Sequence, residues 1–144
     1  GQGAVIRVVD ASVLIKAYVP ETGSEAAARF FAAMDGGEVE ALAPDLIYSE
    51  SGNILWKKVR RGELTAGEAR EISAAILGLP LRVEPGHVLL PLALDLALSC
   101  GVTVYDALYL ALACVHETTF VTADRKLVLA LEATDFRRHV QDLE

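Results

Sequence analysis

Four carboxylates stand at positions where local hydrophobic patterning disfavours a charge. Asp10 and Asp124 each end a short apolar run typical of a buried strand. Asp106 interrupts an almost wholly apolar stretch, and Glu50 begins one face of an expected helix. Carboxylates at such places are costly unless each gains a partner, and four of them can share one divalent metal ion. The pattern therefore indicates metal-dependent chemistry on phosphates.

Each acid also has an ordinary structural explanation. Asp10 and Asp124 are well placed to cap the helices that follow them, and Glu50 can belong to a solvated helix face. Thr22 with Glu25, and Thr65 with Glu68, have the spacing of capping boxes ahead of expected helices. Thr103 and Asp106 have the same spacing. That role is compatible with a second one, because acids are also favoured in the first turn of a helix. No single acid is decisive, and the functional interpretation depends on all four together.

Two hydroxyl groups lie close to the acids in the sequence. Ser12 follows Asp10 by two positions and can share its capping role. Thr122 precedes Asp124 by two positions, so both project to the same side if the strand persists. A hydroxyl there can hydrogen-bond a ligand carboxylate or a metal-bound water.

Amide and basic side chains border the same acids. Asn53 and Lys57 follow Glu50 at offsets of three and seven, so the three project from one face of a helix. Arg125 directly follows Asp124. A solvated helix end explains the cations near Lys57, since the helix dipole favours them there. Alternatively, cations beside an acidic edge guide a polyanion to the metal.

The length and composition predict one domain spanning residues 1–144. Gly1, Gln2 and Gly3 are typical of a cloning remnant and are expected to lie outside its fold. Hydrophobic residues make up 53% of the chain, so either the core is large or another chain covers part of the apolar surface. A homodimer is the simplest arrangement of the second kind.

The net charge of −7 argues against a protein that coats nucleic acid, but a nuclease is compatible with it because metal-binding acids supply part of that charge. Asp95 and Asp106 interrupt the apolar stretch 85–116, so we expect no membrane span. No basic and apolar leader is present, so no secretion signal is expected. Cys100 and Cys114 have no metal-type spacing and are expected to be buried free thiols of a cytoplasmic protein.

Short apolar runs alternate with helical segments, which predicts an α/β fold with a parallel sheet covered on both faces. Ligands of such folds bind beyond the carboxyl ends of the strands, where Asp10 and Asp124 are expected. Strands are predicted at 5–9, 39–43, 81–84 and 119–122, extended segments at 102–104 and 136–140, and helices at 22–34, 44–61, 65–77, 87–99, 105–116 and 126–132.

Four motifs, in order along the chain, resemble those of the PIN-domain ribonucleases. They are VVDASVLIK at 8–16, the pair Glu50 and Asn53, YDALYLA at 105–111 and FVTAD at 120–124. Each motif is weak alone, but the four at these separations extend the resemblance over about residues 5–131. Within that family the chain is most similar to the VapC-type toxins of toxin–antitoxin pairs, which are single small PIN domains.

The resemblance implies a three-layer α/β fold with a mostly parallel central sheet flanked by helices. It implies an endoribonuclease in which a metal-activated water cleaves RNA, a homodimer, and a small antitoxin whose C-terminal segment enters the groove. The implied Mg²⁺ or Mn²⁺ site consists of Asp10, Glu50, Asp106 and Asp124, supported by Ser12, Asn53 and Thr122, with Lys57 and Arg125 expected on the substrate.

Three other interpretations stay open on the sequence. A non-toxin PIN nuclease in RNA processing would share every residue named above. A regulatory binding module with an inactive acid cluster would act through its dimer or partner surface. A flavodoxin-like receiver domain is disfavoured, because its acids gather near the first strand whereas these are widely spread.

Overall fold

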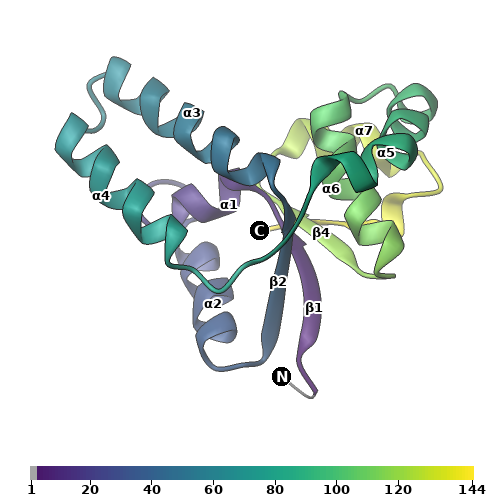
Figure 1. The fold of residues 1–144 in the computed structure, drawn as a ribbon, viewed down its shortest axis with the longest axis horizontal. Helices are drawn as coiled ribbons and strands as arrows, with labels where there is room; N and C mark the ends of the chain where they lie inside the picture. The colour runs from purple at the N-terminus through teal and green to yellow at the C-terminus, as the bar shows by residue number, and fades with distance from the viewer. Residues whose placement is uncertain (1–2) are drawn as a thin grey trace.

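A five-stranded, wholly parallel sheet forms the centre of the protein (Figure 1). The computed structural model describes residues 3–144, so the expectation for Gly1 and Gln2 lies outside the described residues. The strand order is β3-β2-β1-β4-β5, which places β1 in the middle. The strands are β1 (Val5–Val9), β2 (Val39–Pro44), β3 (Arg82–Glu84), β4 (Thr119–Thr122) and β5 (Val140–Asp142).

Helices cover both faces of this sheet, which gives the predicted three layers. The chain moves outward from β1 to β2 and β3, and then crosses back to β4 and β5. Right-handed crossovers therefore place the helices before and after β3 on opposite faces, as Figure 1 shows. One group is α1 (Ala11–Lys16), α2 (Ser24–Asp35), α3 (Leu46–Arg60) and α4 (Ala66–Leu77); the other is α5 (Gly86–Cys100), α6 (Val104–Val115) and α7 (Arg125–Glu132).

The helix α6 contributes the longest buried run in the described chain, with every residue from 107 to 113 in the core. It packs against the sheet on one side and against α5 on the other. In the described part of the chain no single helix is long and apolar enough to cross a membrane. The helices α5 and α6 pass that test only as a pair, and they meet at a bend of 113°.

Two helix starts show how local hydrogen bonds set the boundaries. At α4 the predicted capping box is confirmed, since the Thr65 hydroxyl accepts from the Glu68 amide and the Glu68 carboxylate accepts from the Thr65 amide. The capping box expected at the start of α2 is wrong. There the Ser24 hydroxyl accepts from the Glu21 amide in the preceding turn, and Gly23 enters the helix with a φ of 93° that suits glycine.

Three other expectations need correction. The segment expected to be extended at 102–104 is shorter than predicted: Thr103 has extended backbone as the cap of α6, but Val104 is already helical. The expected strand at 136–140 lies further on: residues 137–139 form a 3₁₀ turn, and β5 follows it. β1 was expected to be fully buried, but only its carboxyl half is, and Val5 is 46% exposed.

Candidate active site

The four acids come together at the carboxyl ends of β1 and β4. These neighbouring strands are where the chain's direction across the sheet reverses, a position at which parallel α/β folds bind ligands. Asp10 follows β1 and Asp124 follows β4, as predicted. Asp106 comes from the first turn of α6 and Glu50 from α3, on opposite sides of the sheet. We call these four residues the acid cluster.

Asp10 lies at the bottom of the acid cluster and is only 9% exposed. It caps α1, as its ordinary explanation predicted, through a 3.2 Å bond from the Val13 amide to Oδ1. The same oxygen accepts from Ser12 Oγ at 2.5 Å, and Oδ2 accepts from Thr122 Oγ1 at 2.6 Å. Burial raises the pKa of Asp10 to about 6, although these hydrogen bonds favour the charged form.

The hydroxyls of Ser12 and Thr122 join Asp10 to the turn after β4. Ser12 Oγ accepts from the Ala123 amide at 3.2 Å, and Thr122 Oγ1 accepts from the Asp124 amide at 3.1 Å. Each hydroxyl therefore donates to one carboxylate oxygen of Asp10 and accepts from a backbone amide of the turn after β4. This pair holds the ends of β1 and β4 in a fixed relation, which in turn fixes where Asp10 and Asp124 stand.

Glu50 is held by Tyr109, a tyrosine of α6 whose ring lies in the core. Tyr109 donates its hydroxyl to Glu50 Oε1 at 2.6 Å, while its ring, 1% exposed, stacks on Phe120 with centroids 5.2 Å apart. Burial raises the pKa of Glu50, the Tyr109 bond lowers it, and the charges of Asp10 and Asp106 raise it. Tyr109 follows Asp106 by three positions on one helix, a spacing that would have signalled a shared face.

Asp106 and Asp124 are the remaining two acids, and each lies at the start of a helix. The Asp106 amide donates to Thr103 Oγ1 at 3.1 Å, which confirms the expected start of α6. Burial raises the pKa of Asp106, and the charge of Asp124 raises it further. Asp124 also caps α7, since its Oδ1 accepts from the Leu127 amide at 3.2 Å. The charge of Asp106 acts on both Asp10 and Glu50, and the charge of Asp124 acts on Asp106, so the four acids lie near one another at this edge of the sheet.

Three residues expected to support the metal site or bind the substrate, Asn53, Lys57 and Arg125, do not contact the acid cluster. Asn53 and Lys57 are exposed on α3, and within residues 3–144 neither makes a side-chain bond to one of the four acids. Arg125 is 75% exposed and reaches Asp142 of β5 at 3.6 Å. The lysine next to Lys57 behaves differently: Lys58 is buried and binds Glu21 at 2.8 Å.

The chemistry of the acid cluster fits a hydrated divalent cation. Among the described residues none of the four acids has a Lys, Arg or His partner within ion-pair distance, so their mutual repulsion is uncompensated. In the same part of the chain, no three His, Cys, Asp or Glu side chains are gathered closely enough to enclose an ion. Mg²⁺ and Mn²⁺ prefer oxygen ligands, and Mg²⁺ keeps several waters and needs only one or two carboxylates. An open set of oxygen donors suits such an ion.

Comparison with known proteins decides the family. The family model described as the PIN domain matches residues 7–130. The chain belongs to the PIN-domain family. It is 42% identical over 122 residues to Ribonuclease VapC3 of Pyrobaculum aerophilum, an alignment that covers 83% of this chain and 90% of that protein. The VapC-type resemblance found in the sequence is thereby confirmed.

Solved structures show the same PIN-domain fold. The crystal structure of PAE2754 from Pyrobaculum aerophilum superposes with a TM-score of 0.70 at 28% identity, covering 99% of this chain and 88% of that one. VapC20 of Mycobacterium tuberculosis, described as a sarcin-ricin loop cleaving toxin, gives 0.62 at 16% identity, covering 84% and 93%. VapBC2 from Rickettsia felis, bound to a promoter DNA fragment, gives 0.61 at 12% identity, covering 96% and 98%. The last two identities speak for the fold alone.

Proposed function

We propose that this PIN domain is a metal-dependent endoribonuclease and the toxin of a toxin–antitoxin pair. The observation that carries the proposal is the acid cluster: four carboxylates from four separate segments lie near the ends of β1 and β4, coupled through their charges and without a cation partner in the described residues. The 42% identity to a protein named as a ribonuclease supports RNA as the substrate.

In this proposal Asp10, Asp106, Asp124 and Glu50 hold Mg²⁺ or Mn²⁺ together, with at most two of the four carboxylates in direct contact with the ion and the others bound to it through water. The bound cation would supply the positive charge that activates water and stabilises the leaving oxygen. Ser12 and Thr122 orient Asp10, so that its carboxylate presents fixed oxygens to the site. The raised pKa values of Asp10, Glu50 and Asp106 follow from burial and from the charges of neighbouring acids, which are the conditions that favour cation binding.

Hydrolysis adds water across the P–O3′ bond of RNA. The water oxygen bonds to phosphorus and loses a proton, O3′ leaves and gains one, and the products carry a 5′-phosphate and a 3′-hydroxyl. We assign Glu50 to accept the proton from water, because a raised pKa makes its carboxylate a stronger base. Tyr109 occupies Glu50 Oε1 and so keeps the carboxylate in one orientation.

The substrate path that we propose runs past Arg125. A pocket of about 280 Å³ next to Asp124 is lined by the cations Lys16 and Arg125 and by the acids Asp142 and Glu144. Arg125 would contact the RNA backbone here by exchanging its 3.6 Å ion pair with Asp142 for a phosphate. Lys57, and Asn53 one turn earlier on α3, are proposed as further contacts on the other side of the groove. These assignments rest on position and charge.

A second copy of this chain is the proposed partner of α5. Val88, Leu90, Leu92, Leu94 and Leu98 are all exposed on this helix, and Leu98 is 76% exposed. So many large apolar side chains on one helix are typical of a covered surface. Light scattering on the wild type should give a dimer, and Leu98→Glu should give a monomer. Leu129→Glu, at a similarly exposed apolar position on α7, should leave the mass unchanged.

The antitoxin partner and the cytoplasmic location are also proposals. The fold is shared with a toxin–antitoxin complex from Klebsiella pneumoniae, with a TM-score of 0.62 at 14% identity. A cytoplasmic location agrees with Cys100 and Cys114, which are both half-buried free thiols rather than the buried ones expected. Inducing the chain in cells and mapping RNA ends tests the toxin role. A toxin halts growth and cuts internally, whereas an RNA-processing enzyme trims precursor ends without halting growth.

RNA cleavage by the purified protein tests the activity. Cleavage should require added Mg²⁺ or Mn²⁺, leave 5′-phosphates, and be abolished by Asp10→Asn. Asp95→Asn is the matched control, because it makes the same chemical change at an exposed position on α5. Full activity in excess chelator, or in Asp10→Asn, would discard the mechanism. Metal binding without cleavage would instead favour the inactive regulatory module.

A further inference from the structure

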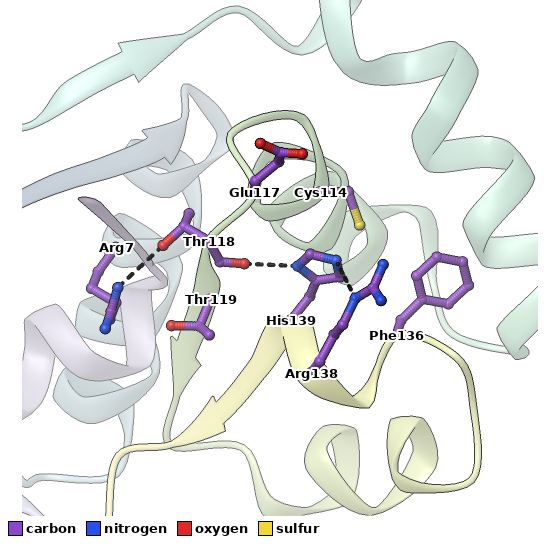
Figure 2. A pocket seen from close by; sticks show the side chains of 8 residues that line it. All are labelled: Arg7, Cys114, Glu117, Thr118, Thr119, Phe136, Arg138 and His139. Atoms are coloured by element: carbon purple, nitrogen blue, oxygen red, sulfur yellow. Dashed lines mark hydrogen bonds between the residues drawn. The ribbon is translucent and has the colours of Figure 1, made fainter. Parts of the chain in front are cut away.

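A basic pocket lies at the end of the sheet opposite the acid cluster. Arg7 precedes Asp10 by three positions, which places the pocket about 10 Å along the strand from the acids. Its volume of about 560 Å³ is within the range of small-ligand sites. The residues that define it here are Arg7 of β1, Thr118 and Thr119 at the start of β4, and Phe136, Arg138 and His139 before β5 (Figure 2).

Neither arginine of the basic pocket has a carboxylate partner among residues 3–144. Arg7 is half-buried in the central strand, where an unpaired charge is costly. Its Nη1 donates to the Ile6 carbonyl at 2.8 Å and to Thr118 Oγ1 at 3.3 Å, which are both neutral. Arg138 donates through Nε to His139 Nε2 at 3.2 Å, also a neutral acceptor. Two positive charges therefore stay uncompensated around one pocket of an acidic protein.

His139 orients Arg138 through its tautomer. Its Nδ1 lies 2.8 Å from the Thr118 carbonyl oxygen, which can only accept, so Nδ1 carries the hydrogen. In the neutral ring Nε2 then has the free lone pair that accepts from Arg138 (Figure 2). Because this bond uses Nε alone, both terminal nitrogens of Arg138 are left for a ligand.

The remaining walls suit a phosphate attached to an aromatic base. Thr119 Oγ1 is buried without a hydrogen-bond partner, and a turn about its Cα–Cβ bond would offer it to a ligand oxygen. Phe136 supplies an aromatic ring on the far side of Arg138, a surface on which bases stack. Glu117 is the acid in the lining, but it is exposed and its carboxylate points away from both guanidinium groups in Figure 2.

We propose that the basic pocket binds a mononucleotide, with Arg7 and Arg138 on its phosphate and its base against Phe136. Guanidinium groups are suited to phosphate because their donors match two of its oxygens at once. The volume exceeds what phosphate alone would fill, which favours a ligand with a nucleoside attached. This site is separate from the acid cluster and needs no metal.

Titration of the full chain with AMP in excess chelator tests this proposal, since chelation prevents metal-bridged phosphate binding at the acid cluster. Amide NMR shifts should change at residues 118–120 and 136–139 and leave those of Asp10 and Asp124 unmoved. Adenosine should bind at least about tenfold more weakly than AMP, because it lacks the charged group that the arginines bind. Inorganic phosphate should compete with AMP.

Variants test whether AMP binding depends on Arg7 and Arg138 or only on the overall charge of the protein. Arg138→Gln, on an exposed turn, should weaken AMP binding about tenfold, and Arg7→Gln in addition should abolish it. Arg70→Gln, an exposed arginine of α4, should bind as the wild type does. RNA cleavage by Arg138→Gln should be unchanged, which keeps this test independent of the proposed nuclease. Equal AMP affinity in Arg138→Gln, shifts confined to the acid cluster, or binding of RNA oligonucleotides without competition by AMP would overturn the proposal.

Discussion

Replacing Asp10 by asparagine is expected to stabilise the folded protein when divalent cations are removed. Burial raises the pKa of Asp10 from its ordinary value of 3.8 to about 6, so the folded chain holds a proton more tightly than the unfolded chain does. The stability that this proton provides is fully present when the pH is below the ordinary pKa of 3.8, and it is lost as the pH rises through about 6. At neutral pH this difference between the folded and unfolded pKa values of Asp10 lowers the free energy of unfolding by about 3 kcal/mol. Asparagine is neutral and nearly isosteric, so the variant should recover about 1–3 kcal/mol.

Urea unfolding in EDTA, at one fixed protein concentration, measures this gain. At pH 7.5 the variant should be the more stable protein, and at pH 5 its advantage should fall to about half, because the wild type then protonates Asp10. Adding Mg²⁺ or Mn²⁺ at about one thousand times its Kd should reverse the order, since binding then stabilises the wild type by about 4.1 kcal/mol, more than the variant gains. Asp95→Asn should show neither effect. A variant no more stable than the wild type at pH 7.5, or a gain independent of pH, would refute the reasoning.

Three further predictions concern single hydrogen bonds. Tyr109→Phe removes the donor to Glu50, so the pKa of Glu50 should rise further. The carboxylate also loses the bond that orients it, so the kcat/KM of RNA cleavage should fall about tenfold, and an unchanged rate would exclude this bond from the mechanism. Thr122→Val removes a bond that lowers the pKa of Asp10, so the acidic limb of the pH–rate profile should move to higher pH; a limb that stays in place would contradict the assignment. Thr65→Ala breaks a capping box, so urea unfolding should show a loss of about 1 kcal/mol while cleavage is unaffected.

The parts that could be predicted from the sequence depend on local pattern. β1 and β4 are short apolar runs, and a parallel sheet brings their carboxyl ends to one edge, so the meeting of Asp10 with Asp124 follows from the strands alone. Thr122 lies two positions from Asp124, so its direction also follows from strand geometry. That its hydroxyl reaches Asp10 agrees with the expectation that it would bond a carboxylate.

The parts that could not be predicted depend on contacts between distant segments. The partner of Tyr109 is Glu50, 59 residues earlier and on the other side of the sheet, so only the assembled fold brings them together. Ser24 has the local pattern of a helix cap, yet its hydroxyl bonds back to Val19 and Glu21 instead. At Lys57 and Lys58 the sequence shows two adjacent cations, and only tertiary packing decides that the second is buried against Glu21.

The position of β4 late in the chain determines when the acid cluster is completed during translation. Asp10 and Glu50 leave the ribosome early, but Asp124 is the last of the four acids and reaches its position only when β4 pairs with β1. Until that pairing forms, Ser12 and Thr122 have no strand end to join, and the nascent chain holds an incomplete set of carboxylates. If cleavage needs all four acids, as proposed, a copy of this protein that is still being translated has no complete site until β4 has emerged and paired with β1.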